Sequence, residues 1–209
     1  LNEKPTISIL NSFSAPVLVE FKQSIDDMFS ILEFETDYTS VWMAKKKLDF
    51  IALEKISSEQ PDVENVIART YKILTDKLDR ASLLAKLIEL PSDNEYFLKV
   101  LETEIPDPKT IQTNLLKYEA LYKNYFEEFS ISYFENFINQ KLYLRKNSDY
   151  KERALACALI FLNKDTIFID DFLNIIFNNS DNMSLKISCL ISFIVKKDKK
   201  ENVEEFYSK

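Results

Sequence analysis

The chain has 209 residues with no glycine and no histidine, and its 27 basic and 34 acidic side chains give a net charge of -7. Average usage would supply about 15 glycines, so the composition excludes phosphate-binding loops, nucleophile elbows and Asn-Gly hairpins. The missing histidine excludes imidazole acid–base catalysis, histidine-activated nucleophiles and His-ligated zinc. Because an acidic chain lacks the basic face that displaces counterions from phosphates, we expect no nucleic-acid partner.

The remaining composition is typical of a globular chain, since 46% of the residues are hydrophobic and 13% are aromatic. The longest apolar run, Ala154–Leu162, is far shorter than the roughly 20 residues of a membrane span, so we expect no membrane partner. Cys157 and Cys189 each lie in an apolar stretch and are expected to be buried free thiols. We therefore expect a cytoplasmic protein.

The first 21 residues differ in pattern from the rest of the chain. Thr6–Leu10 and Val17–Phe21 are short, rich in β-branched residues and partly alternating, which predicts two β-strands. A turn-rich linker that ends at Pro16 separates them. Two strands alone are marginally stable in water, so these strands need partners.

From Ser24 onward the hydrophobic period becomes helical, first in a short helix and then in a long one. Asp37 is a favourable N-cap for the long helix, which runs from Val41 to Ile56. Within it, the run Lys45-Lys46-Lys47 is interpreted as a solvated face. Pro61 predicts the first turn of the next helix.

Further breakers and caps divide the middle of the chain into helices. A helix over 79–89 ends at Leu90-Pro91, and Ser92 with Glu95 forms a capping-box pattern that opens the next helix. Asp107 caps a helix that extends through Tyr122. A separate aromatic helix around Tyr133–Leu142 follows, and Ser148 is expected to cap the one after it.

The last third contains an internal repeat with a 32-residue spacing. Five apolar positions of the first copy recur in the second: Leu155, Cys157, Leu159, Phe161 and Leu162 against Ile187, Cys189, Ile191, Phe193 and Ile194. In each copy we expect a charged turn, at Lys164-Asp165 and at Lys196-Lys197-Asp198, and then a second helix, Asp170–Phe177 in the first and Val203–Tyr207 in the second. Stacked helix pairs of this period predict a mainly α fold, an α-solenoid of antiparallel pairs behind one or two short N-terminal strands.

Adjacent carboxylates are the remaining candidates for chemistry, namely Asp26-Asp27, Glu127-Glu128, Asp170-Asp171 and Glu204-Glu205. Neighbours on a helix point about 100° apart, so such pairs rarely share a proton or a metal ion. An oxygen-only cation site of the EF-hand kind would need a turn glycine, and the chain has none. We therefore predict no catalytic, cofactor-binding or metal-ligating residue in this chain.

Several short segments, in order along the chain, are similar to those of one known family. They are Ser8–Val17 (SILNSFSAPV), Asp37–Ala44 (DYTSVWMA), Leu90–Ser92 (LPS), Asp107–Ile111 (DPKTI), Arg153–Leu155 (RAL), Asn182–Ser184 (NMS) and Glu205–Tyr207 (EFY). These resemble the S-L-L-R-x-F-S-A-P-V, D-x-F-x-R-W-E-A, L-P-S, D-P-x-x-I, R-A-L-K-N, N-M-T-D and D-F-Y-E-R-W segments of the bacterial-type zinc-dependent aminopeptidase N family. The chain departs from that pattern at Val41 and Met43, where the family has Arg and Glu.

This resemblance implies a domain division and a function for a larger parent enzyme. Residues 1–21 would be the terminal strands of a truncated β-sandwich module, and residues 22–209 a C-terminal helical domain that is incomplete at its own C-terminus. The parent would remove N-terminal residues from peptides at a zinc site, while the helical domain encloses the active-site chamber and restricts access to it. The family's H-E-x-x-H and G-x-M-E-N motifs have no counterpart here, so no family site residue is carried over.

The same resemblance sets the expected partners and cofactor. The cofactor would be zinc in the parent enzyme and none in this chain. The partners would be the catalytic and β-sandwich domains of the parent, with peptide substrate bound only by the intact enzyme. The alternative hypothesis is an independent α-helical repeat scaffold for protein–protein interaction, which the internal repeat fits equally well.

Overall fold

A computed structural model describes residues 6–8, 22–77 and 80–207, with side chains through residue 197. Nine α-helices and no strand are found in this part of the chain, which confirms the predicted mainly α class. Thr6, Ile7 and Ser8 are in neither helix nor strand, and the remainder of the two predicted strands lies outside the described residues. Among the described residues, no helix is both long enough and apolar enough to cross a bilayer.

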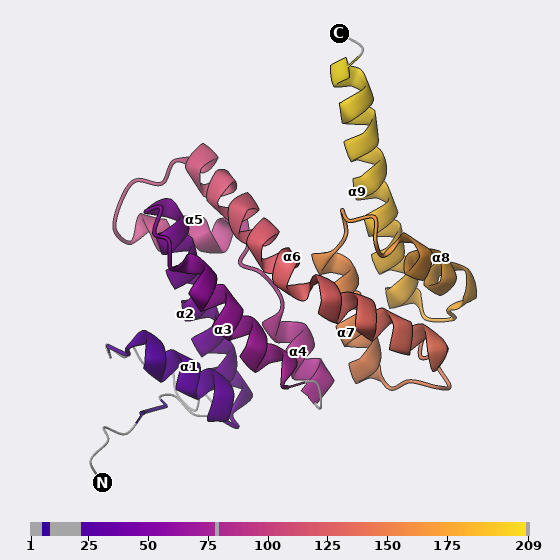
Figure 1. The fold of residues 1–209 in the computed structure, drawn as a ribbon, viewed down its shortest axis with the longest axis horizontal. Coiled ribbons are helices and arrows are strands. Elements are labelled where there is room, and N and C mark those ends of the chain that lie inside the picture. Colours follow the sequence, from indigo (N-terminus) through magenta and orange to yellow (C-terminus); the bar gives the residue numbers. More distant parts are fainter. Residues whose placement is uncertain (1–5, 9–21, 78–79, 208–209) are drawn as a thin grey trace. The chain divides into compact units, whose positions relative to one another are not determined.

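The chain divides into two compact units. Unit 1 comprises Leu1–Asp76 and Leu90–Tyr125, and unit 2 comprises Lys77–Glu89 and Phe126–Lys209. The long helix α6 (Pro108–Asn139) contributes its first part to unit 1 and its second part to unit 2 (Figure 1).

Unit 1 contains four complete helices and the first part of α6. The four are α1 (Ile25–Phe34), α2 (Tyr38–Ser57), α3 (Val63–Thr75) and α5 (Asp93–Leu101). Helices α1, α2 and α3 pack against one another, and their buried side chains include Phe29, Leu32, Val41, Leu48, Leu53, Ile67 and Leu74. Arg69 of α3 also lies over the ring of Phe29, 4.1 Å from its centroid.

The predicted N-caps Asp37, Ser92 and Asp107 are confirmed, and Ser24 is the N-cap of α1. Ser24 and Ser92 each form a capping box, in which the serine hydroxyl accepts from the N3 backbone N–H and the N3 carboxylate accepts from the serine N–H. Asp37 accepts a hydrogen bond from the Ser40 N–H at 2.8 Å, and Asp107 accepts one from the Thr110 N–H at 3.0 Å. These side chains satisfy helix donors that would otherwise have no intrahelical partner.

Unit 2 contains α4 (Ala81–Leu87), the second part of α6, α7 (Tyr150–Leu162), α8 (Asp170–Asn179) and α9 (Met183–Tyr207). Helix α7 packs against both α4 and α9, and α8 packs against α9. The fully buried Phe134 of α6 stacks on Phe172 of α8 with ring centroids 5.7 Å apart. Asn163 at the end of α7 donates to the Ser130 hydroxyl of α6 at 3.0 Å.

Three predicted helix boundaries in unit 2 or α6 are wrong. The chain forms one 32-residue α6 where we expected two helices, because no proline or glycine interrupts the stretch between Tyr122 and Tyr133. Helix α9 continues through the expected charged turn at Lys196–Asp198, since lysines are good helix formers. The N-cap of α7 is Asp149 rather than Ser148, and its carboxylate accepts from the N–H groups of Lys151 and Glu152.

Two helices end in Schellman motifs without a glycine. At the end of α2 the Gln60 N–H donates to Lys55 O at 2.9 Å and the Glu59 N–H donates to Ile56 O at 3.2 Å. The same pair of bonds ends α6, with Lys141 in the position of Glu59. Glu59 and Lys141 have φ values of 52° and 53°, a region that costs a residue with a Cβ about 1 kcal/mol or more.

This geometry predicts that glycine at either position stabilises the chain. We expect Glu59→Gly and Lys141→Gly each to raise the free energy of unfolding by about 0.5–1 kcal/mol in urea titrations, because glycine removes the Cβ penalty. The neighbouring substitutions Gln60→Gly and Gln140→Gly are the controls and are expected not to stabilise. A loss of stability in Glu59→Gly and Lys141→Gly would contradict the assignment of strain to these two residues.

Candidate functional site

Three of the carboxylates considered in the sequence, Asp26, Asp27 and Asp170, are used in a cap or in surface ion pairs. Asp26 pairs with Arg69 at 2.8 Å, and Asp27 completes the Ser24 capping box. Asp170 forms an ion pair with Lys196. The exposed Glu127 and Glu128 follow each other on α6, and the side chains of Glu204 and Glu205 lie outside the description. In the described part of the chain, no three His, Cys, Asp or Glu side chains gather closely enough to hold a metal ion.

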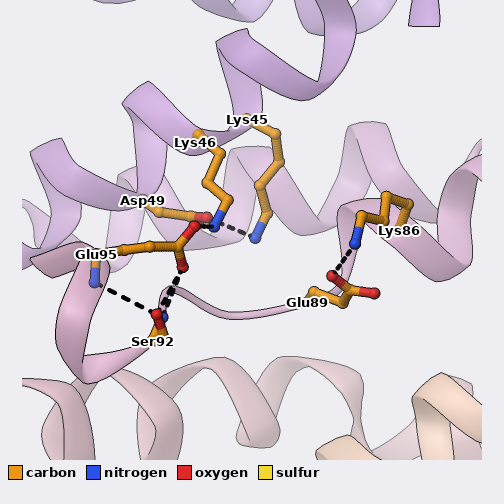
Figure 2. Close-up of polar contacts among 7 residues, drawn as sticks. All are labelled: Lys45, Lys46, Asp49, Lys86, Glu89, Ser92 and Glu95. Carbon is orange, nitrogen blue, oxygen red and sulfur yellow. Dashed lines mark hydrogen bonds and ion pairs between the residues drawn. The ribbon is translucent and has the colours of Figure 1, made fainter. Parts of the chain in front are cut away.

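The densest polar feature of unit 1 is a buried cluster of Lys45, Asp49, Tyr118 and Tyr122. The side chains of Lys45 and Asp49 are 2% and 1% exposed, and they lie one turn apart on α2 (Figure 2). Lys45 Nζ is 2.8 Å from Asp49 Oδ2 and 5.0 Å from the ring centroid of Tyr122. The Tyr118 hydroxyl of α6 donates to Asp49 Oδ1 at 2.6 Å. One oxygen of Asp49 therefore pairs within α2, and the other ties α2 to α6 through Tyr118.

Burial governs the protonation of this cluster. Removal from water raises the pKa of Asp49, and the Lys45 ammonium and the Tyr118 hydroxyl oppose that rise. Burial, together with the nearby Asp49 charge, raises the pKa of Tyr118 and of Tyr122 well above the ordinary value of 10.0. Both tyrosines therefore remain neutral phenols at physiological pH.

The arrangement is suited to holding helices together rather than to catalysis. Each of the four residues is at most 2% exposed, so none presents a reactive atom to a substrate in solution. A buried ion pair contributes little net stability, but the loss of one partner leaves an uncompensated charge and is costly. The cluster therefore makes the α2–α6 contact specific.

The position of Lys45 corrects the interpretation of Lys45-Lys46-Lys47 as a solvated face. Lys45 is four residues after Val41 and three before Leu48, so it occupies the buried stripe of α2. The signal was present in the sequence, since Asp49 follows Lys45 at the i,i+4 spacing of a helical ion pair. Lys46 and Lys47 are half-buried and donate to Glu95 and Gln23.

Removal of the buried ammonium tests the cluster. Lys45→Met is expected to lower the free energy of unfolding by about 3–5 kcal/mol at pH 7, because it leaves the Asp49 carboxylate buried without its ion-pair partner. Without Lys45 the pKa of folded Asp49 rises further above its unfolded value. The Lys45→Met variant is therefore least destabilised at low pH, where Asp49 is protonated, and loses stability as the pH rises. The decrease in its free energy of unfolding should accordingly be smaller at about pH 4 than at pH 7.

Lys47→Met on the same helix is the matched control and is expected to change stability by about 0.5 kcal/mol or less. Urea titrations of both variants at the two pH values measure the effect. Equal costs for Lys45→Met and Lys47→Met would show that the Lys45 charge is not part of a buried pair.

A second polar contact in unit 1 joins α2 to the start of α5. Lys46 Nζ is 2.6 Å from Glu95 Oε1, while Glu95 Oε2 accepts from the Ser92 N–H at 2.8 Å (Figure 2). Lys46 also lies 5.7 Å from the ring centroid of Trp42. Partial burial raises the pKa of Glu95, but the Lys46 ammonium and the Ser92 donors outweigh it and hold that pKa below the ordinary 4.5.

Neutralising Glu95 tests this contact. Glu95→Gln keeps the capping-box geometry but removes the charge, so we expect a loss of about 0.5 kcal/mol at pH 7, a value limited by solvent screening. Because the pKa of folded Glu95 is lowered, its contribution is present above about 4.5 and disappears as the pH falls through the folded value. In urea titrations, the difference in the free energy of unfolding between Glu95→Gln and the unsubstituted chain should be smaller at pH 3 than at pH 7.

Glu89→Gln is the control, since Glu89 forms a 2.6 Å pair with Lys86 in unit 2 while both side chains are more than half exposed. We expect it to have a smaller effect than Glu95→Gln at pH 7. A Glu95→Gln difference that grows at pH 3 would contradict the sign of the pKa shift.

The two cysteines are free and unsuited to nucleophilic chemistry. Cys189 of α9 is buried, as predicted, whereas Cys157 of α7 is partly exposed. Burial raises the pKa of Cys189 to about 12 and also raises that of Cys157. Both are therefore protonated thiols at neutral pH, and a thiol in that state is a poor nucleophile and metal ligand.

The fold and its packing define a class of protein, the helical-repeat domains, in which successive helices stack side by side. Within this class the chain belongs to the family described as "Domain of unknown function (DUF3458_C) ARM repeats", whose model matches residues 25–209. This description agrees with the predicted solenoid class, and it names no activity.

A solved structure shares the fold. The chain is similar to the crystal structure of Legionella pneumophila aminopeptidase A in complex with aspartic acid, with a TM-score of 0.69 and 21% sequence identity. The match covers 100% of this chain and 26% of that chain. The chain therefore spans about a quarter of the length of that aminopeptidase and has the fold of that part.

Proposed function

We propose that this chain is the non-catalytic helical domain of a zinc aminopeptidase that removes N-terminal residues from peptides. The observation that carries the proposal is the fold similarity over 100% of the chain to about a quarter of an aminopeptidase. The order of the short segments from Ser8–Val17 to Glu205–Tyr207 supports the same family of enzymes. The composition is consistent with this role, because a chain without histidine needs its catalytic metal ligands elsewhere.

In this proposal the parent's chemistry and this chain's role are separate. Zinc, held by a catalytic domain outside residues 1–209, would supply an activated water for attack on the scissile carbonyl. Residues 22–209 would form a rigid helical wall that encloses the active-site chamber and restricts which peptides enter. Residues 1–21 would complete a β-sandwich module of the same parent.

The properties of unit 1 suit such a wall. The buried Lys45–Asp49–Tyr118 contacts and the Lys46–Glu95 pair fix α2 against α6 and α5. The buried Lys45, Asp49 and Tyr118 present no reactive atom to a substrate, as expected of a domain that acts by its shape. We further propose a cytoplasmic location for the parent, since both thiols are free.

The proposal predicts that the purified 209-residue chain binds no zinc tightly and does not hydrolyse aminoacyl-p-nitroanilides. The protein encoded by the complete reading frame should do both, with an H-E-x-x-H motif ahead of Leu1 and hydrolysis that a chelator abolishes and zinc restores. Metal analysis and anilide hydrolysis of the two proteins, prepared in parallel, are the measurements.

Two outcomes would contradict the proposal. One is zinc-dependent hydrolysis by the 209-residue chain itself, after purification from a peptidase-deficient host. The other is a complete reading frame without H-E-x-x-H, which would favour the independent helical-repeat scaffold that the ARM-repeat description also fits.

A further inference from the structure

The segment that joins α6 to α7 in unit 2 carries a positive charge in an otherwise acidic chain (Figure 1). Residues 141–153, which we call the basic α6–α7 segment, contain five basic and two acidic side chains, a net charge of +3. The rest of the chain contains 22 basic and 32 acidic side chains, a net charge of -10. The five basic residues of the segment are Lys141, Arg145, Lys146, Lys151 and Arg153.

Four of these five cations are exposed and form no ion pair within the described part of the chain. They are Lys141, Arg145, Lys146 and Lys151. Basic side chains elsewhere do pair, as Lys99 does with Glu102 at 2.6 Å. Since the chain has more acidic than basic side chains, four unneutralised cations on one short segment produce a local positive potential.

The carboxylates that contact this segment bind its backbone rather than its cations. Asp149 Oδ1 accepts from the N–H groups of Lys151 and Glu152 as the N-cap of α7. Asp181 Oδ1 accepts from the Arg145 N–H at 2.9 Å. Both acids therefore help to fix the segment and leave its four exposed ammonium and guanidinium groups to solvent.

Further hydrogen bonds hold the backbone beneath the four cations. The Ser180 hydroxyl donates to Tyr143 O at 2.7 Å, and the Asn147 amide donates to Lys141 O at 3.2 Å. The half-buried Arg153 donates from Nη1 to the Ser148 hydroxyl at 3.0 Å. Because the backbone is already ordered, an anion that binds here has to order only the cationic side chains, which lowers the entropic cost of binding.

We propose that the basic α6–α7 segment is a docking surface for a short acidic segment of another polypeptide, one with about four Asp or Glu residues in succession. Four exposed cations match that number of carboxylates. Tyr150, which is 65% exposed and precedes Lys151, adds an aromatic ring for contact with the same partner. This inference goes beyond the proposed function and does not depend on it, because it follows from charge and hydrogen bonding within unit 2.

The charge of the whole chain favours a short acidic partner over an extended polyanion. A nucleic-acid duplex or an anionic bilayer would extend past the segment and meet the net charge of -10 on the rest of the chain, which repels it. A short peptide interacts mainly with the segment itself, since exposed charges more than about 8 Å apart are largely screened at physiological ionic strength.

The test uses an acetylated peptide with four consecutive glutamates that carries a neutral dye, and its glutamine counterpart as the control peptide. Fluorescence anisotropy with the 209-residue chain should show binding of the glutamate peptide alone. Its affinity should fall about tenfold or more between about 50 mM and 300 mM salt. Arg145→Glu combined with Lys146→Glu should weaken binding about tenfold or more, because two of the four cations are reversed. Neither side chain has a partner in the described chain, so the urea midpoint should not change.

Lys109→Glu combined with Lys117→Glu, at two exposed lysines of unit 1, is the matched control, because it changes the net charge by the same amount. It should leave the affinity within about twofold. Equal weakening by both double variants would overturn the proposal, and so would the absence of binding at about 1 mM peptide in about 50 mM salt. Tighter binding of a DNA duplex or of phosphatidylserine vesicles than of the glutamate peptide, lost in the Arg145→Glu and Lys146→Glu double variant, would assign the segment to another partner and overturn it too.

Discussion

A helix that is apolar on two opposite faces must lie between two neighbours, and this requirement governs how the chain can be organised. Helix α7 meets it, since Leu155, Leu159 and Ile160 are all buried and α7 packs against both α4 and α9. Hydrophobic burial then provides the main free energy of each layer, and no layer is stable by itself. Helix α9 carries the same pattern one repeat later, which makes stacking, rather than any reactive side chain, the organising feature of unit 2.

The absence of glycine has a structural consequence that is visible at two helix ends. Stacked helices need few turns with positive φ, so a glycine-free chain can build them. Where α2 and α6 end in Schellman motifs, Glu59 and Lys141 take the conformation that glycine usually supplies. The absence of glycine, which excludes phosphate loops and nucleophile elbows, thus also explains the local strain at Glu59 and Lys141.

Features of this fold that depend on neighbouring residues are predicted from the sequence better than features that depend on contacts between distant residues. The caps at Asp37, Ser92 and Asp107 depend on side chains within three residues of the helix start, and all three are confirmed. The i,i+4 spacing of Lys45 and Asp49 is a local signal for an ion pair, but the burial of that pair depends on α6, where Tyr122 lies under Lys45 and Tyr118, 69 residues after Asp49, donates to the carboxylate. Charge was likewise an unreliable sign of a turn at Lys196, where the helix continues. The exposure of Ile187, Ile191 and Ile194 of α9 likewise could not be predicted from the sequence, since their apolar pattern is that of the buried Leu155, Leu159 and Leu162 of α7.

Under the proposed function, this chain would be a helical wall of a larger enzyme and would contribute no atom to its chemistry. The most direct test is a cryo-electron microscopy structure of the complete encoded protein with zinc bound. The account predicts that residues 22–209 pack beside a zinc-bearing domain and line its chamber, with every metal ligand outside this chain. A zinc ion coordinated by a residue of this chain, or helices that stand apart from any catalytic domain, would contradict it.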